Sequence, residues 1–182
     1  MTELEACVLA VVWRQGPMSA YQVRREFERS PASSWRASTG SIYPLIKRLR
    51  TLGLVDVNPV PHDGRKTALL LASKEGRAQV RSWLKGAPPW LADVAEDPIR
   101  TRVQFLTLLD ATTGSQVANE MLLATEAAIE RLREFMTTFE IRSLERLAHE
   151  GALVMLLARL GWLKRVRSHF ARSLKRHNHD ND

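Results

Sequence analysis

Ser38-Thr-Gly-Ser-Ile-Tyr-Pro-Leu-Ile-Lys-Arg-Leu-Arg-Thr-Leu-Gly-Leu-Val55 is the stretch that decides the fold of this 182-residue chain. In a helix its apolar residues fall at i, i+3, i+4 and i+7, so they form a single stripe of Ile42, Leu45, Ile46 and Leu49. Small, polar and basic residues lie opposite that stripe and along its flanks. Gly53 ends the helix, because glycine adopts a left-handed conformation most easily. The pattern predicts a helix that packs one face on a small core and presents the other.

A short hairpin is predicted directly after this helix. Leu54 and Val55 start its first strand, and Asp63-Gly64 turns the chain back into a second strand over 66–71. A presentable helix followed by a hairpin with a basic tip is the layout of a winged helix-turn-helix, which is a DNA-reading module. The pattern by itself also allows an ordinary amphipathic helix beside an ordinary hairpin.

Start and stop signals predict the other helices of this first domain. A helix over 3–14 ends at Gly16-Pro17, a capping box at Ser19 starts a helix to about residue 28, and Ser73 caps a helix over 74–84. The segment 30–34 is predicted as a loop. The helix over 3–14 is apolar on two sides, so we expect it to lie between the winged domain and a second body.

The clearest break in the chain is Gly86-Ala-Pro-Pro89, because two prolines cannot continue a helix. We therefore predict a mainly α-helical protein with a winged helix-turn-helix domain over 1–86, a helical dimerisation domain over 90–176 and a disordered tail over 177–182. In the second domain, Asp97-Pro98 starts a helix to about residue 109. Residues 112–115 are predicted to separate it from a long helix, and the last helix covers 152–176.

The two long helices of the second domain carry apolar residues at steps of three and four, as in a coiled coil. Packing within a compact bundle would produce this spacing, and so would dimerisation. The last helix has two apolar stripes, which is more than one partner helix needs, so we expect a homodimer. The expected dimer contacts come from the first and last helices: Leu9, Trp13, Leu153, Leu156, Leu160 and Leu163.

Positive charge is concentrated in the first domain. Residues 1–87 hold 14 Lys or Arg against 7 Asp or Glu, whereas residues 88–182 hold 13 of each. Basic charge gathered on one module favours a polyanionic partner, since neutralised phosphates release counterions. The asymmetry does not separate DNA from RNA or from an acidic protein. The single cysteine, the lack of an apolar span long enough for a membrane and the lack of a signal peptide predict a cytoplasmic protein with no membrane partner.

Hydroxyl and basic residues around the presented helix are the candidate DNA contacts. Lysine and arginine read guanine O6 and N7, and serine and tyrosine hydroxyls commonly hold phosphates. Ser19 and Tyr21 start a helix whose N-terminus could face a phosphate, although a plain cap and a core aromatic explain them equally. A solvated turn is the alternative for the wing tip. The full set is Ser19, Tyr21, Ser38, Thr39, Ser41, Tyr43, Lys47, Arg48, Arg65 and Lys66.

The stretch Gly40–Val55 closely resembles the recognition helix and first wing strand of the PadR family of transcriptional regulators, whose motif there is a glycine, a hydroxyl residue, an aliphatic residue and Tyr-Pro, then Leu, basic residues and Gly-Leu. Asp63-Gly-Arg-Lys66 is similar to the family's wing tip, and Trp162-Leu163 to a pair in its longer members. Met18-Ser-Ala-Tyr21 departs from the His-Gly-Tyr that is frequent in the family. The resemblance implies a homodimeric bacterial repressor, and several family members release DNA when a small aromatic or lipophilic compound binds. We expect such a dimer to bind an operator of matching two-fold symmetry.

Other functions find little support in the sequence. No nucleophile motif, P-loop or dinucleotide fingerprint is present, so we expect neither an enzyme nor a cofactor. The five histidines form no cluster with zinc spacing, so no metal is expected. Trp90, Phe105 and Trp162 are candidates for an effector pocket, with ordinary bundle core as the alternative. The rival function is a winged-helix module that binds a ligand or a protein without reading a DNA sequence.

Overall fold

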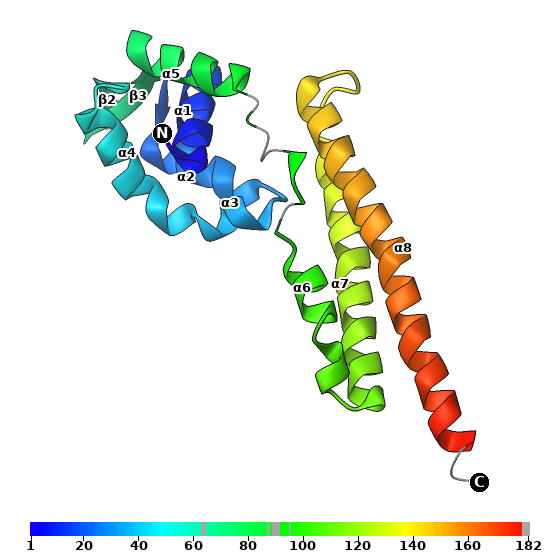
Figure 1. The fold of residues 1–182 in the computed structure, drawn as a ribbon. Coiled ribbons are helices and arrows are strands. Elements are labelled where there is room, and N and C mark those ends of the chain that lie inside the picture. Colours follow the sequence, from blue (N-terminus) through cyan, green and yellow to red (C-terminus); the bar gives the residue numbers. More distant parts are fainter. Residues whose placement is uncertain (63–64, 87, 89–91, 95, 180–182) are drawn as a thin grey trace. The chain divides into compact units, whose positions relative to one another are not determined.

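Most of the chain is helical, and the predicted fold class is confirmed (Figure 1). The computed structural model describes residues 1–62, 65–86, 88, 92–94 and 96–179, and for 33, 37, 60–62, 65–67 and 173–179 it describes the backbone alone. The chain divides into two compact units, Met1–Asp93 and Val94–Asp182. None of the described helices is long and apolar enough to span a lipid bilayer.

The first unit is a winged helix-turn-helix with a three-stranded antiparallel sheet in the order β1-β3-β2. The predicted loop over 30–34 is wrong at its end, because a short helix begins at Ser33. The two-residue strand β1, which pairs with β3, was not predicted. In chain order the elements are α1 (Glu3–Gln15), β1 (Met18–Ser19), α2 (Ala20–Arg29), α3 (Ser33–Ala37), a 3₁₀ turn (Thr39–Ser41), α4 (Ile42–Thr51), β2 (Val55–His62), β3 (Arg65–Ala72) and α5 (Lys74–Lys85).

Helix α1 packs inside this unit on both of its apolar sides. Leu9 is completely buried in the core of the winged domain. Trp13 packs against the same core and carries the Arg81 guanidinium 4.8 Å above its ring. The second body that covers α1 is therefore α5 of the same unit, and the expectation that Leu9 contacts another copy is corrected: its side chain has no surface to offer.

The end of α4 and the start of α5 are joined by a tight set of backbone contacts. Gly53 has a φ of +68°, the left-handed conformation predicted for it. Ser73 donates its hydroxyl to the Gly53 carbonyl at 2.8 Å and accepts the Gly76 N–H at 2.9 Å. A Cβ at position 76 would collide with the carbonyl oxygen of Leu54. Glycine is therefore required there, because α5 presses directly on the backbone that follows α4.

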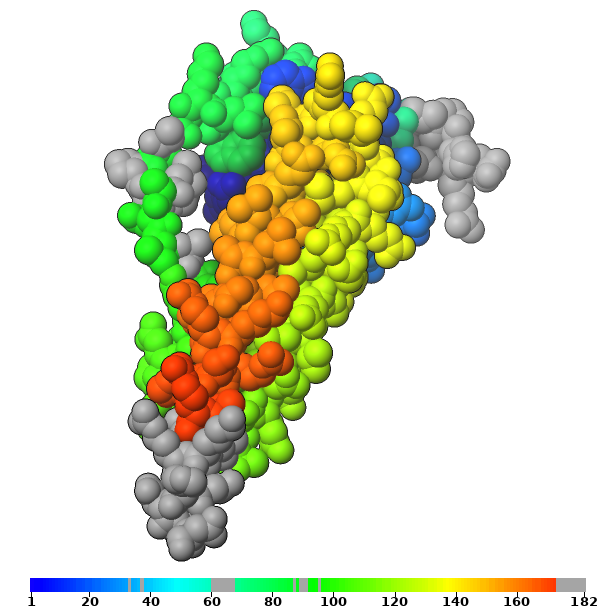
Figure 2. Space-filling model, turned by 90° about the vertical axis from the view of Figure 1, so that its right-hand side faces the viewer, coloured from blue at the N-terminus to red at the C-terminus, as the bar shows by residue number. Residues whose placement is uncertain are grey.

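The second unit consists of a short helix and a long helical hairpin, in which α7 and α8 lie side by side (Figures 1 and 2). The helix predicted to reach residue 109 ends earlier, because i→i+3 hydrogen bonds from Phe105 and Leu108 tighten the backbone into a 3₁₀ turn. The tail predicted over 177–182 is helical through His179, and residues 180–182 lie outside the described residues. The elements are α6 (Pro98–Val103), a 3₁₀ turn (Leu106–Leu108), α7 (Ala111–Met136) and α8 (Leu144–His179).

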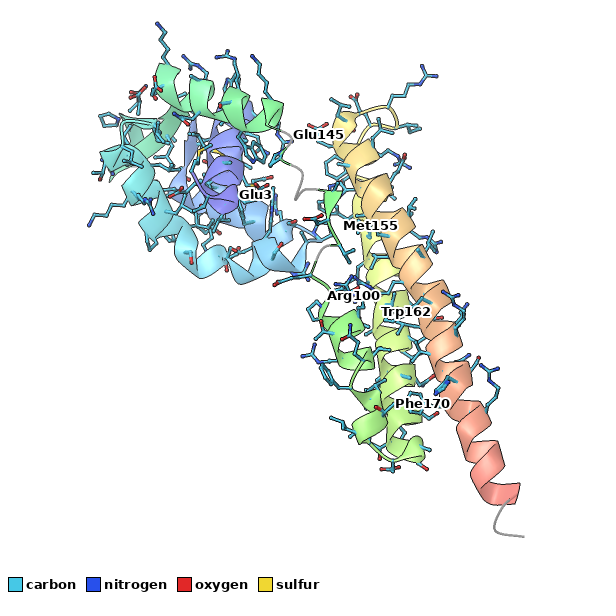
Figure 3. All side chains as sticks on the ribbon, viewed as in Figure 1. Glu3, Arg100, Glu145, Met155, Trp162 and Phe170 are labelled. Atoms are coloured by element: carbon cyan, nitrogen blue, oxygen red, sulfur yellow. The ribbon has the colours of Figure 1, made fainter. Side chains whose placement is uncertain are left out.

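Residues 112–115 do not separate two helices as predicted, since α7 begins at Ala111 with Asp110 as its cap. Gly114 lies inside α7, where it packs against a side chain of α8. A Cβ on it would be 2.5 Å from the ring of Phe170 on α8, which is labelled in Figure 3. The glycine thus leaves room for the Phe170 ring against the α7 backbone.

The two stripes of α8 have different environments. The predicted dimer residues Leu153, Leu156 and Leu160 are half-buried and Leu163 is fully buried within the single chain, on the side that packs along α7. Leu163 is fully buried and has no surface left for a second copy, whereas the dimer contacts predicted for Leu153, Leu156 and Leu160 stay a prediction. An outer stripe at heptad spacing stays exposed, and we define it as Leu144, Leu147, Gly151, Val154 and Ala158.

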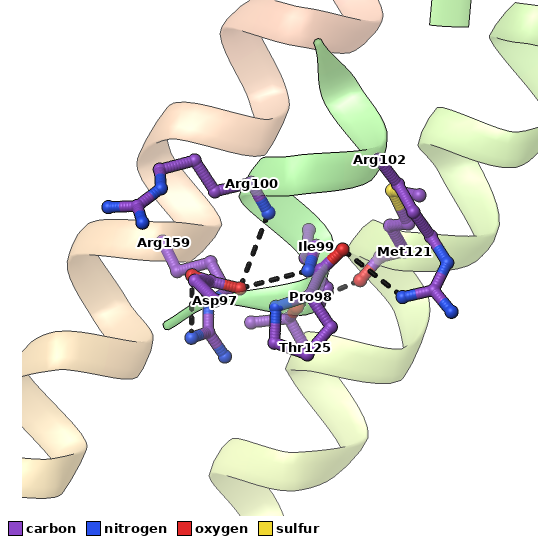
Figure 4. A network of polar contacts seen from close by, with 8 residues as sticks. All are labelled: Asp97, Pro98, Ile99, Arg100, Arg102, Met121, Thr125 and Arg159. Atoms are coloured by element: carbon purple, nitrogen blue, oxygen red, sulfur yellow. Dashed lines mark hydrogen bonds and ion pairs between the residues drawn. The ribbon is translucent and has the colours of Figure 1, made fainter. Parts of the chain in front are cut away.

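A polar network ties the start of α6 to α8 (Figure 4). One carboxylate oxygen of Asp97 accepts the N–H groups of Ile99 and Arg100, as predicted for an N-cap. The other accepts Nε and Nη2 of Arg159 at 3.1 and 2.8 Å. Burial opposes ionisation of this carboxylate, but the Arg100 N–H and the charge of Arg159 outweigh burial and lower the pKa of Asp97 below 3.8.

Replacing Asp97 with alanine is expected to cost the second unit about 1–2 kcal/mol, because α6 loses its cap and Arg159 loses its partner. Asp97→Asn keeps cap acceptors and loses the charge, so it should cost less. Because the pKa of Asp97 is lowered by folding, its contribution is present above about pH 4 and is lost as the pH falls through the folded-state pKa. Urea unfolding at pH 7 and pH 3 measures both effects, and an equal wild-type-to-Asn difference at the two pH values would contradict them.

Candidate nucleic-acid interface

Helix α4 has one buried face and one open face. Ile42, Ile46 and Leu49 are buried in the core of the winged domain, as the apolar stripe predicts. On the open face, Ser41, Pro44 and Lys47 are exposed and Tyr43 is 47% exposed. Pro44 is the third residue of the helix, where its missing N–H breaks no helical hydrogen bond. The open face therefore offers hydroxyl and ammonium groups on a short, well-supported helix.

Hydrogen bonds of the residues before α4 stabilise the turn that connects α3 to α4. Ser38 donates its hydroxyl to the Ser34 carbonyl at 2.7 Å, and Thr39 donates to the Arg36 carbonyl at 3.1 Å. Both side chains are half-buried. These hydrogen bonds stabilise the turn that leads into α4. The two predicted contact residues therefore have a structural role that the sequence pattern did not indicate.

The predicted capping box at the start of α2 is present. Ser19 accepts the Gln22 N–H at 3.2 Å, and the Gln22 side chain accepts the Ser19 N–H at 2.7 Å. Tyr21 is 57% exposed, with the Arg25 guanidinium 5.9 Å from its ring centroid. Tyr21 is therefore not a core aromatic residue. It is a surface side chain beside a helix N-terminus.

Lys47 and Arg48 are neighbours in sequence with different environments. Lys47 makes no ion pair within the described part of the chain, whereas Nε of Arg48 lies 3.2 Å from a carboxylate oxygen of Glu5 on α1. Lys47 also lines a groove of about 510 Å³ between the end of α4 and the start of β2, together with Arg50, Thr51, Val55, Asp56 and Val57. Sequence reasoning missed this groove, since it depends on how β2 leaves the helix.

Arg24 of α2 is a further basic residue at this surface that the sequence did not single out. Its guanidinium pairs with Glu28 at 2.6 Å. The hydrogen bond and charge of Glu28 raise the pKa of Arg24, and the Tyr43 side chain adds to that shift, which places Arg24 beside α4. The packing of α2 against α4 decides this proximity, and no local motif could have indicated it.

The wing is a regular two-stranded ladder from Val55 opposite Ala72 to His62 opposite Arg65. Its predicted tip, Asp63-Gly64, lies outside the described residues. Arg65 and Lys66 begin β3, but their side chains are also outside the description. Their contact with a nucleic-acid backbone therefore stays a prediction.

The predicted effector residues have different environments. Phe105 is exposed after α6, Trp162 is half-buried on α8 (Figure 3), and Trp90 lies outside the description. Within the described ranges, no group of three His, Cys, Asp or Glu side chains has the arrangement of a metal site. Burial, together with the charge of Glu3, raises the pKa of Cys7 to about 11, so this thiol is protonated at neutral pH.

Comparison with known proteins finds a family match over the winged unit. Residues 8–82 match the model of the transcriptional regulator PadR-like family, which confirms the resemblance for that unit. A search of curated proteins found no match.

Solved structures show the same fold over nearly the whole chain. PadR of Bacillus subtilis in complex with operator DNA is 20% identical, covers 93% of this chain and 98% of its own, and superposes with a TM-score of 0.79. The same protein in complex with p-coumaric acid is 20% identical and covers 92% and 95%, with a TM-score of 0.71. The virulence activator AphA of Vibrio cholerae is 16% identical and covers 94% and 99%, with a TM-score of 0.71.

Proposed function

Because residues 8–82 identify its winged unit as PadR-like, we propose that this protein is a transcriptional regulator that reads duplex DNA with α4 as its recognition helix. The observation that carries the proposal is the open face of α4, which presents Ser41, Tyr43 and Lys47 on a helix fixed by three buried aliphatic residues. Such a helix fits the major groove, where lysine reads guanine and hydroxyl groups hold phosphates. The protein would act in the cytoplasm, and its site supports binding and not catalysis.

The outer stripe of α8 supports assembly into a homodimer. Val154 is 65% exposed and Leu147 is 52% exposed, although both are aliphatic and lie seven residues apart on one helix face. A second copy of the stripe would cover these side chains, and its glycine and alanine would allow close approach. A two-fold dimer would bind an operator of matching symmetry, with half-sites about 34–36 Å or a multiple of that apart.

A repressor released by a small aromatic effector is the regulatory form of this proposal. Its support is the shared fold with the Bacillus subtilis PadR structures that contain operator DNA and p-coumaric acid. The test of the whole proposal is selection of bound sequences from random duplex DNA by the full-length protein. Enrichment of a two-fold symmetric sequence is expected, and enrichment of no sequence at physiological salt would overturn the proposal.

Lys47→Ala is expected to weaken binding to the selected duplex by about 1–3 kcal/mol, which is roughly tenfold to a hundredfold in Kd. The reason is that Lys47 is exposed on the open face and makes no ion pair with the described residues. Fluorescence anisotropy with the selected duplex measures this loss. Lys85→Ala at the end of α5 removes the same charge outside α4 and is the matched control. An equal loss in both variants would show that total charge, and not the α4 face, determines affinity.

A further inference from the structure

A carboxylate is buried at the start of α1, where it contacts the recognition helix. The side chain of Glu5 is only 6% exposed. Its Oε2 accepts the Thr2 N–H at 2.7 Å, and its Oε1 lies 3.2 Å from Nε of Arg48. A buried charge is tolerated when it is paired and hydrogen-bonded. The hydrogen bond from the Thr2 N–H to Oε2 belongs to the capping box of α1, and Oε1 is the oxygen that contacts α4.

Arg48 contacts Glu5 through one nitrogen, and most of its side chain is exposed to solvent. The contact with Glu5 uses Nε, and 67% of the Arg48 side chain is exposed. An unrestrained arginine samples many rotamers and loses that freedom when it binds. An arginine fixed through Nε keeps the Nη groups of its planar fork for a second acceptor, such as a guanine edge or a phosphate.

We propose that Glu5 is a positioning residue for DNA reading: from α1 it holds the guanidinium of Arg48 in one orientation on the flank of α4, so that the Nη groups meet the duplex preorganised. This inference rests on the proposed function and extends it to a residue outside the helix-turn-helix. The capping box alone does not require the contact, since it is complete with Thr2.

The sign of the electrostatic effect separates positioning from simple attraction. Glu5 is negative, so its charge opposes the approach of any phosphate backbone. Glu5→Gln should therefore strengthen binding to an unrelated duplex while it weakens the preference for the selected one. We expect the ratio of the two Kd values to fall about fivefold, in the range of couplings between contacting residues.

The experiment measures Kd for the selected duplex and for a scrambled duplex with wild type, Glu5→Gln, Arg48→Ala and the double variant. The Kd ratio should fall in Glu5→Gln, and Glu5→Gln should change nothing further in the Arg48→Ala background. Glu3→Gln is the matched control, because it makes the same charge change two residues away. Glu3 accepts the Trp83 indole N–H at 2.9 Å, and glutamine preserves that acceptor (Figure 3).

A purely structural tie between α1 and α4 gives a different result. It would lower the thermal midpoint of Glu5→Gln and leave the Kd ratio of the remaining folded protein unchanged, which overturns the inference. If Glu5→Gln does not fold, Arg48→Lys keeps the charge and leaves α1 untouched but removes the planar fork that Glu5 orients, so it should also lower the ratio. A wild type that does not discriminate between the duplexes would overturn the proposed function itself, whereas an unchanged ratio on a discriminating wild type overturns this inference alone.

Discussion

Glutamate at both Leu147 and Val154 is expected to leave this protein as a folded monomer at micromolar concentration. The two side chains lie on the outer stripe of α8 and are exposed in the single chain, so the substitutions do not disturb the packing of α8 on α7. In the proposed homodimer the stripe meets its own copy, and four carboxylates would be buried without partners. That burial costs at least about 3 kcal/mol, more than a hundredfold in the dimer Kd.

Light scattering or analytical ultracentrifugation measures the loss of the dimer, and circular dichroism checks that the monomer is folded. Leu123→Glu on α7 is the control, because it places the same charge at an exposed leucine outside the stripe. Binding to the selected duplex should fall with dimerisation, since one winged unit makes few base contacts. A wild type that is monomeric at micromolar concentration, or a double variant that stays dimeric, would contradict the proposed interface.

Gly76→Ala is expected to destabilise the winged unit by about 2 kcal/mol or more. The new methyl group meets the Leu54 carbonyl, which is backbone and cannot rotate away, so α5 must move off the strand that follows α4. The gain of about 1 kcal/mol from replacing glycine inside a helix offsets part of that cost. Gly40→Ala is the matched control because a Cβ there has open space around it, and its effect should be small. Equal thermal midpoints for the two variants would show that the unit relaxes around position 76.

Local signals predicted the winged unit well, because its helices begin and end at residues with local roles. Ser19 and Ser73 cap the helices that the sequence assigned to them, and Gly53 has the expected left-handed conformation. The burial of Ile42, Ile46 and Leu49 follows directly from their spacing. Each of these features depends on residues within about two helical turns of each other, so a local stretch of sequence is enough to predict it.

Contacts between distant segments were not predictable in the same way. Glu5 is an acidic residue in the first turn of a helix, where acidic residues are common, so its place in the sequence indicates no further role. Only the fold shows that Arg48 reaches it. Periodicity predicted two apolar stripes on the last helix, but it missed the outer stripe, which begins at Leu144, before the predicted start of that helix at residue 152. The stripe with Leu156 and Leu163 is the inner one, because it packs against α7 of the same chain.

The contact between Gly114 and Phe170 favours one register of the α7–α8 hairpin. Gly114 is the single glycine of α7, so only one axial alignment lets the Phe170 ring approach the α7 backbone so closely. A slip of one helical turn, about 5.4 Å, would place Ala118 or Asp110 under the ring, and each of them has a Cβ. Helical pairs that signal by sliding need two alignments of similar energy. Gly114 favours the present alignment, so we expect any movement passed through this hairpin to be that of a rigid rod that tilts or rotates as a whole.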